Sequence, residues 1–282
     1  MHSERPEVAV VQMNGRADWS ANRPVVERLV AEAAEGGACL AVLPENLLAM
    51  PAHPAELVAM AERDTPAAIE SLCDMARRHG IWLVAGTLPA VPAEGGHGSQ
   101  VAARSLVIDA KGEVVAQYDK IHLFDVVLPD GESYRESATF RAGDSLVLVD
   151  TPAGRLGMAT CFDLRFPELF ARLARQGADW FCLPSAFTRT TGQAHWHVLT
   201  RARAIENSAW LVAAAQVGRH ADGRETYGHS LVADPWGQVL VDAGNEPDCV
   251  RFARLDYEWL RGLRERFPVR RLHRPDLFDD GQ

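Results

Sequence analysis

Three residues with reactive side chains follow apolar segments that are typical of buried strands. Glu45 ends one such segment, Lys120 follows a second and Cys161 follows a third. A strand end holds a side chain firmly, while the adjoining loop leaves room for a substrate. A carboxylate, an ammonium group and a thiol in such places can serve as base, oxyanion donor and nucleophile.

Cys161 also opens a helix-like stretch, residues 162–168. A sulfur near a helix N-terminus is close to unpaired backbone N–H groups, which favour a thiolate and an oxyanion beside it. A buried cysteine that packs as a small hydrophobe is the alternative interpretation. A serine hydrolase is disfavoured because no G-x-S-x-G occurs, whereas a papain-like Cys–His pair stays open because ten histidines are available.

Hydrolysis of an amide needs a strong nucleophile, a proton shuttle and a group that stabilises the developing oxyanion. Cys161 would attack the carbonyl carbon and form a thioester. Glu45 would take the thiol proton, deliver it to the leaving group and then activate water. Lys120 and the backbone N–H of Phe162 would hold the oxyanion. These roles require neither a metal nor an organic cofactor.

The motifs around these residues resemble those of one family, the nitrilase superfamily of carbon–nitrogen hydrolases. The matching segments span residues 6–278 and include Pro44-Glu45-Asn46, Tyr118-Asp-Lys120-Ile-His122, Cys161-Phe-Asp-Leu-Arg165, Thr191-Gly-Gln-Ala-His195-Trp196, Tyr227-Gly-His-Ser230 and Asp234-Pro-Trp-Gly237. The resemblance implies an α/β fold, the four-layer alpha-beta-beta-alpha sandwich. It also implies that Glu136 supports Lys120 and positions substrate or water.

Within the superfamily the chain is most similar to the branch of deaminated glutathione amidases, with omega-amidases next. The resemblance therefore implies a cysteine-dependent amidase that acts on a linear amide of a small carboxylated substrate and releases ammonia, in metabolite repair. Deaminated glutathione is the first expected substrate and 2-oxoglutaramate the second. Hydrolysis of an N-carbamoyl amine is an alternative, and a catalytically silent binding protein of the same fold is a non-enzymatic one.

A substrate with carboxylates needs cationic or hydroxyl donors. The segment after the strand-like run 180–183 offers Phe187, Thr188, Arg189 and Thr191, and Arg165 is a further candidate, although Asp163 and Glu168 could pair with it instead. Two positions depart from the family pattern: Phe162 replaces a tyrosine, and His197 replaces a frequent glutamate.

Composition favours one domain of an intracellular enzyme, residues 1–282, with a core at about 6–260 and a C-terminal tail at about 261–282; the resemblance implies that it is a carbon–nitrogen hydrolase domain. The chain has 282 residues, 47% hydrophobic and 24% charged, and no Pro/Ser/Gly-rich linker divides it. Residues 91–100 are predicted to be a surface connection without the spacing of a phosphate loop. Five scattered cysteines imply neither a disulfide framework nor a zinc knuckle. We expect a cytoplasmic protein because no signal peptide or membrane span is visible.

A net charge of −9 argues against nucleic acid as a partner. An arginine-rich segment near the C-terminus is expected to pair with a neighbouring subunit, and the family resemblance implies a homodimer or larger oligomer. His195 and His197 could suggest a metal site, but residues two apart on a helix point to different faces. We therefore expect no bound metal.

Alternating strand and helix patterns run through the chain. Strands are predicted at 7–13, 38–44, 82–86, 101–109, 113–118, 180–183, 210–215, 230–233 and 238–242, and helices at 25–34, 66–79, 167–175 and 194–206. Asp109-Ala-Lys-Gly112-Glu-Val114 and Asp234-Pro-Trp-Gly237-Gln-Val239 share a D-x-x-G-x-V pattern. This repetition predicts two similar halves with stacked sheets and outer helices.

Overall fold

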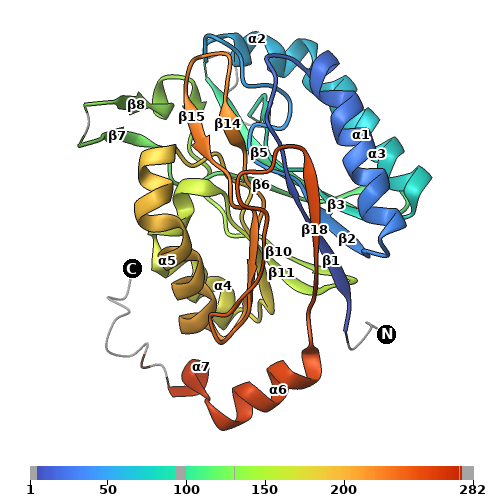
Figure 1. The fold of residues 1–282 in the computed structure, drawn as a ribbon, viewed down its shortest axis with the longest axis vertical. Coiled ribbons are helices and arrows are strands. Elements are labelled where there is room, and N and C mark those ends of the chain that lie inside the picture. Colours follow the sequence, from blue (N-terminus) through green and yellow to red (C-terminus); the bar gives the residue numbers. More distant parts are fainter. Residues whose placement is uncertain (1–4, 93–99, 130, 273, 275–282) are drawn as a thin grey trace.

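Two β-sheets lie face to face, and helices cover their outer sides (Figure 1). The computed structural model describes residues 5–92, 100–129, 131–272 and 274. The connection predicted at 91–100 lies largely outside these residues. The four layers confirm the predicted alpha-beta-beta-alpha sandwich, and α6 and α7 lie together at one end of the molecule (Figure 1).

The first sheet has eight strands in the order β18-β1-β2-β3-β5-β4, with β6 and β9 also paired to β5. Its strands are β1 (Glu7–Gln12), β2 (Leu40–Val42), β3 (Trp82–Val84), β4 (Leu88–Ala90), β5 (Val101–Ile108), β6 (Val114–Asp119), β9 (Phe140–Arg141) and β18 (Cys249–Arg254). The parallel strands β1, β2 and β3 form its centre.

The second sheet has six strands in the order β10-β11-β12-β13-β16-β17. They are β10 (Leu148–Thr151), β11 (Gly154–Met158), β12 (Trp180–Cys182), β13 (Trp210–Ala213), β16 (Leu231–Ala233) and β17 (Val239–Asp242). Two separate hairpins are β7 (Asp125–Val127) with β8 (Ser133–Arg135) and β14 (Val217–Arg219) with β15 (Glu225–Tyr227).

Helices flank both sheets. They are α1 (Trp19–Glu35), α2 (Glu56–Arg63), α3 (Thr65–His79), α4 (Pro167–Arg175), α5 (Arg189–Asn207), α6 (Tyr257–Arg266) and α7 (Val269–Leu272). The predicted bounds of α4 are confirmed, whereas α5 begins five residues earlier than predicted. The sequence patterns did not predict α2, α6 or α7. Within the described residues, the structure contains no helix with the length and apolarity of a membrane span.

Strand alternation explains why the sheets are covered on both faces. In β1, Val8 and Val10 belong to the core between the sheets, whereas Ala9 and Val11 pack in the core under α1 and α3. A strand that is apolar at every position buries both faces, as expected for a central strand of a layered fold. Cys182 is fully buried between the sheets.

The two D-x-x-G-x-V segments form equivalent turns, one in each sheet. Oδ1 of Asp109 accepts hydrogen bonds from the backbone N–H groups two and four residues later, at 2.9 Å each, in the β5–β6 turn. Oδ1 of Asp234 does the same in the β16–β17 turn, at 2.9 and 2.8 Å. Gly112 and Gly237 have φ of 77° and 84°, a conformation that favours glycine. This equivalence explains the repeated pattern.

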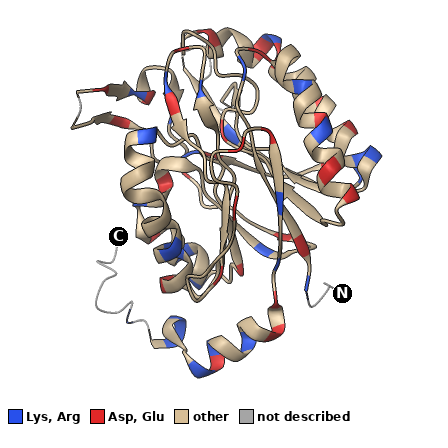
Figure 2. Cartoon of the chain, in the orientation of Figure 1, with Lys and Arg blue, Asp and Glu red and all other residues tan. Residues whose placement is uncertain are grey.

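Basic residues lie along α6 and α7 (Figure 2). Two of them bind other parts of the same chain. Arg264 pairs with Asp179 at 2.8 Å, and Arg270 donates to the carbonyl oxygens of Asn207 and Ala178. Guanidinium groups are favoured near helix C-termini, where backbone carbonyls lack helical partners. These contacts fasten the C-terminal helices to the ends of α4 and α5.

Candidate active site

Glu45 stands three residues after the end of β2, in a loop held by contacts with its neighbours. The Gln216 side chain donates to the Glu45 carbonyl oxygen at 2.8 Å. Gly86 lies against the same loop, where an added Cβ would lie 1.9 Å from the Pro44 carbonyl oxygen. Only glycine fits this close backbone approach. The Glu45 side chain is 5% exposed, so its position is fixed by the surrounding structure.

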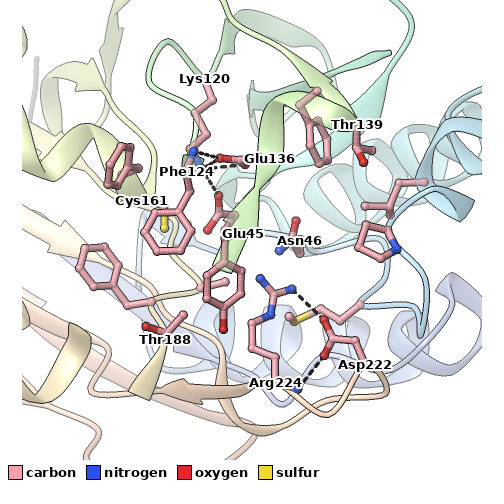
Figure 3. Close-up of a pocket in the computed structure, with 18 of the residues that line it drawn as sticks. Glu45, Asn46, Lys120, Phe124, Glu136, Thr139, Cys161, Thr188, Asp222 and Arg224 are labelled. Carbon is pink, nitrogen blue, oxygen red and sulfur yellow. Dashed lines mark hydrogen bonds and ion pairs between the residues drawn. The ribbon is translucent and has the colours of Figure 1, made fainter. Parts of the chain in front are cut away.

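Lys120 follows β6 directly, and its ammonium lies between two carboxylates (Figure 3). Nζ donates to Glu45 Oε1 at 2.9 Å and to both oxygens of Glu136, at 2.8 and 2.9 Å. The side chain is 2% exposed. Burial opposes the positive charge, but Glu136 and Glu45 together raise the pKa of Lys120 well above its ordinary value. Lys120 is therefore a buried permanent cation.

Glu136 begins a short 3₁₀ turn, Glu136–Ala138, after the β7–β8 hairpin. Its carboxylate binds Lys120 and also accepts a hydrogen bond from the backbone N–H of Phe124. Burial raises the pKa of Glu136, while Lys120 acts in the opposite direction. The hairpin thus delivers a second carboxylate to the ammonium, as the family resemblance implied.

Cys161 lies in a sharp turn and not at the start of an α-helix. The turn is a five-residue 3₁₀ segment, Cys161–Arg165, and α4 begins only at Pro167. The φ of Cys161 is 47°, which is unfavourable for a residue with a side chain. Its backbone N–H donates to the Pro184 carbonyl at 2.9 Å, which anchors the strained residue.

The prediction that the backbone stabilises Cys161 as a thiolate is wrong, because the surroundings of the sulfur favour the protonated thiol. Burial, and then the charge and hydrogen-bond acceptor of Glu45, raise the pKa of Cys161 well above its ordinary value, while Lys120 partly opposes them. Five residues of 3₁₀ turn offer far less dipole than a long helix. The resting nucleophile is a thiol, so it needs a base, and Glu45 is the carboxylate beside it.

The side chain of Asp163 stabilises the turn that contains Cys161. Its fully buried carboxylate accepts hydrogen bonds from the Tyr118 hydroxyl at 2.6 Å and from the Thr160 N–H at 2.8 Å. It also binds Nδ1 of His122 at 2.7 Å. His122 is thereby committed to Asp163, and the ionisable groups that act most strongly on the Cys161 thiol are Glu45 and Lys120. This arrangement differs from a papain-like Cys–His pair.

These residues open onto one cavity (Figure 3). The cavity is lined by the catalytic candidates Glu45, Lys120, Glu136, Cys161 and Phe162, and by Phe187, Thr188, Thr191 and Arg165 from the predicted substrate-binding set. Arg189 does not line this cavity: its side chain is 63% exposed and pairs with Glu225 at 3.1 Å. Helix geometry explains the difference, since Thr188 and Thr191 are three residues apart and share a face that Arg189 does not.

Arg165 is held by neighbours other than the acids considered in the sequence. Its Nη1 lies 3.1 Å from Nδ1 of His195, and its guanidinium lies 5.6 and 5.3 Å from the ring centroids of Phe162 and Phe187. Asp163 is occupied by Tyr118 and His122. Burial lowers the pKa of Arg165. A cation packed on aromatic rings at the cavity wall is well suited to meet an anionic ligand.

Arg224 is a cavity residue that the sequence did not reveal. Arg224 lies in the turn of the β14–β15 hairpin, directly before β15. One of its terminal nitrogens pairs with Asp222 at 3.3 Å (Figure 3). Its Nε is buried and has no hydrogen-bond partner among the described residues. A buried donor without a partner costs about 1–3 kcal/mol. The motif that begins at Tyr227 does not include Arg224, so no local signal placed Arg224 opposite Cys161.

Comparison with known proteins assigns the chain to a family. A family model described as "Carbon-nitrogen hydrolase" matches residues 7–265. The chain belongs to the carbon–nitrogen hydrolase family. It is therefore an enzyme of the class that hydrolyses carbon–nitrogen bonds, as the motifs around Glu45, Lys120 and Cys161 indicated.

Individual relatives cover nearly the whole chain. A human protein named "Deaminated glutathione amidase" is 42% identical over 276 residues, which are 98% of this chain and 84% of that protein. The crystal structure of the C. elegans NitFhit protein superposes with a TM-score of 0.91 at 37% identity, over 98% of this chain and 67% of that one. An amidase mutant from Nesterenkonia sp. AN1 has a TM-score of 0.80 at 28% identity, over 98% and 97% of the two chains. That structure shows covalent addition of the acetamide moiety of fluoroacetamide at the active site cysteine.

Proposed function

We propose that this enzyme is a cysteine-dependent amidase whose substrate is deaminated glutathione. The observation that carries the proposal is the buried contact of Lys120 with Glu45 and Glu136, beside the Cys161 thiol. The human relative at 42% identity, with its printed name, supports the choice of substrate. The cavity arginines support it chemically.

The substrate has carboxylates at both ends and a keto group next to one of them. Arg165 and Arg224 line the cavity and supply cationic donors, while the charge of Lys120 is balanced by its two glutamates. Guanidinium groups bind carboxylates through paired, charge-assisted hydrogen bonds. The unpartnered Nε of Arg224 is the donor best placed to gain from such a ligand.

In the first half-reaction, Glu45 accepts the Cys161 thiol proton as sulfur attacks the amide carbon. The carbonyl oxygen becomes an oxyanion that Lys120 Nζ and the Phe162 N–H stabilise. Collapse of this adduct breaks the carbon–nitrogen bond, and Glu45 returns the proton to the departing nitrogen. An acyl thioester on Cys161 remains. Oxyanion donors of this kind each contribute about two to three powers of ten in rate.

In the second half-reaction, Glu45 takes a proton from water, which attacks the thioester and releases the acid and free thiol. Ammonia is the leaving group only for a primary amide such as 2-oxoglutaramate. For deaminated glutathione the leaving group is the amino group of cysteinylglycine. The acid released from both substrates is 2-oxoglutarate, so one assay reads both reactions.

The experiment is a comparison of kcat/KM for 2-oxoglutarate release from deaminated glutathione and from 2-oxoglutaramate, with Cys161→Ala as the blank. We expect a preference of about 100-fold or more for deaminated glutathione, which is about 2.7 kcal/mol of transition-state binding. Preference for 2-oxoglutaramate would make the protein an omega-amidase. Turnover of neither substrate would overturn the proposal and make N-carbamoyl amines the next class to test.

A further inference from the structure

A cluster of two histidines and one aspartate lies outside the catalytic cavity. His197 comes from α5, His229 from the turn before β16, and Asp242 ends β17. Nε2 of His197 lies 2.9 Å from Asp242 Oδ2, and Nδ1 of His229 lies 3.0 Å from Asp242 Oδ1. One ligand atom from each residue falls within 4.8 Å of the other two.

We propose that His197, His229 and Asp242 form a binding site for a divalent transition-metal ion, with zinc as the best fit. Imidazole nitrogens suit zinc, copper and nickel, whereas calcium and magnesium prefer oxygen ligands. Three protein ligands leave a fourth position for water in a tetrahedral site. His195 and His197 point to different faces of the helix, and the fold supplies His197 with partners from two other segments instead.

The distances from one oxygen of Asp242 to the two histidines match a coordination shell. Bond lengths of about 2.0–2.1 Å to zinc place neighbouring tetrahedral ligands about 3.3 Å apart. Oδ2 of Asp242 lies 2.9 Å from Nε2 of His197 and 3.2 Å from Nδ1 of His229, so the carboxylate and each ring can bind one ion after side-chain shifts. The ion would replace the protons that now lie between the carboxylate and the rings. Each ring can keep a proton on its other nitrogen, so both imidazoles bind in their neutral form.

The backbone around the cluster is fixed before any ion binds. The indole N–H of Trp196, a fully buried residue next to His197, donates to the His229 carbonyl at 2.8 Å. The His229 N–H donates to the Gly244 carbonyl at 2.8 Å, and the Gly244 N–H donates to Asp242 Oδ1 at 2.8 Å. These bonds join all three ligand-bearing segments. Such outer contacts orient ligands and strengthen metal binding.

The ligands are supported by an aromatic ring and are open to solvent. The Tyr227 ring stacks on His229 with centroids 4.4 Å apart and meets His197 edge-on at 6.1 Å. The side chains of His197, His229 and Asp242 are 35%, 21% and 31% exposed. His229 also borders a surface hollow lined by Gln193 and Asn245, through which an ion can enter. An ion here would tie α5 to the second sheet.

Zinc titration of the full-length protein tests the site. The catalytic thiol can bind zinc by itself, so the titration is performed on metal-stripped Cys161→Ala protein by calorimetry. We expect one saturable site and a higher thermal midpoint in the presence of zinc. His197→Ala and Asp242→Asn should each weaken zinc binding by about 10-fold or more. His195→Ala removes a histidine of the same helix outside the cluster and should leave the affinity unchanged.

Absence of saturable binding up to about 0.1 mM zinc would overturn the proposal. An unchanged zinc affinity in His197→Ala and Asp242→Asn would also overturn the proposal, because the ion would then bind elsewhere. Asp242→Asn keeps the shape and a hydrogen-bonding group of the side chain, which guards against loss of folding. Cobalt provides an independent measurement, since its visible absorption reports tetrahedral coordination. This absorption should weaken in His197→Ala and Asp242→Asn but not in His195→Ala.

Discussion

Lys120 Nζ and Glu45 Oε1 are 2.9 Å apart although 75 residues separate them in the chain. They follow β6 and β2, which belong to the same sheet, and the second sheet brings Cys161 to the same point. The ammonium, the carboxylate and the thiol are all buried. The protonation state of each group depends on the other two. Substitution of one group should therefore change stability and activity through all three.

Replacement of Lys120 by methionine should damage both stability and turnover. Two buried carboxylates would lose their cation, which typically costs about 3–5 kcal/mol of folding free energy. The oxyanion would lose a donor, and kcat should fall by about 100-fold to 1000-fold. Urea unfolding and 2-oxoglutarate release measure the two effects.

The double variant Lys120→Met with Glu136→Gln separates these effects. Removal of one of the two carboxylates should recover at least about 1 kcal/mol of the lost stability. Activity should stay low because the ammonium is still absent. Recovery of activity together with stability would show that Lys120 has only a structural role.

Replacement of Glu45 by glutamine should remove the base that accepts the Cys161 thiol proton during attack on the substrate. Because burial raises the pKa of this thiol, its reaction at neutral pH depends on an adjacent base. We expect kcat/KM to fall by about 100-fold to 10,000-fold. Because the Glu45 charge also raises the pKa of Cys161, its removal should shift the pH profile of Cys161 alkylation by iodoacetamide, followed at this site by mass spectrometry, to lower pH.

Glu113→Gln is the matched control for this prediction, since Glu113 is an exposed glutamate beside β6. In the Glu113→Gln variant, the rate of Cys161 alkylation and kcat/KM should equal those of the unsubstituted protein. If kcat/KM of Glu45→Gln equalled that of the control, the thiol would attack the substrate without Glu45, and another base would have to be sought.

The main catalytic candidates could be predicted because each follows a strand within a recognisable motif. Arg224 could not, since its position depends on how the β14–β15 hairpin folds over the cavity. The sequence makes Arg189 a candidate for substrate binding because it closely follows a predicted strand, but Thr188 caps α5 and the Arg189 side chain points outward. Local patterns fix where a strand ends, whereas long-range packing decides which side chains meet.

Replacement of Arg224 by methionine should weaken binding of carboxylated substrates. Its buried Nε has no partner among the described residues, so a substrate carboxylate would gain a charge-assisted hydrogen bond, worth about 1.5–3 kcal/mol. We expect kcat/KM for deaminated glutathione to fall by about 10-fold to 150-fold, mainly through KM. Turnover of a neutral short-chain amide should change little.

Two further variants test whether Arg224 acts through its guanidinium. Arg224→Lys keeps the charge without the planar fork and should give an intermediate loss. Arg219→Met removes an exposed arginine of the same hairpin and should have no effect. Equal losses for the carboxylated and the neutral substrate in Arg224→Met would indicate that Arg224 supports the hairpin and does not bind a carboxylate.

Removal of the Cys182 thiol should change how stability depends on alkaline pH. Burial between the sheets raises the pKa of Cys182 to about 12. In the unfolded chain this thiol ionises near pH 9, whereas in the folded protein it stays protonated until about pH 12. The unfolded state therefore loses a proton first, and stability falls as pH rises through this window, by about 1.4 kcal/mol per pH unit.

Between about pH 9 and pH 12 the free energy of unfolding should decline less steeply in the Cys182→Ala variant. The difference in slope corresponds to the release of one proton. Urea unfolding at several pH values measures the two slopes, and the comparison of slopes cancels the constant loss from the small cavity. Tyrosines and lysines titrate in both proteins and contribute equally. Parallel slopes would mean that Cys182 ionises alike in the folded and unfolded states, which is incompatible with a thiol buried between two sheets.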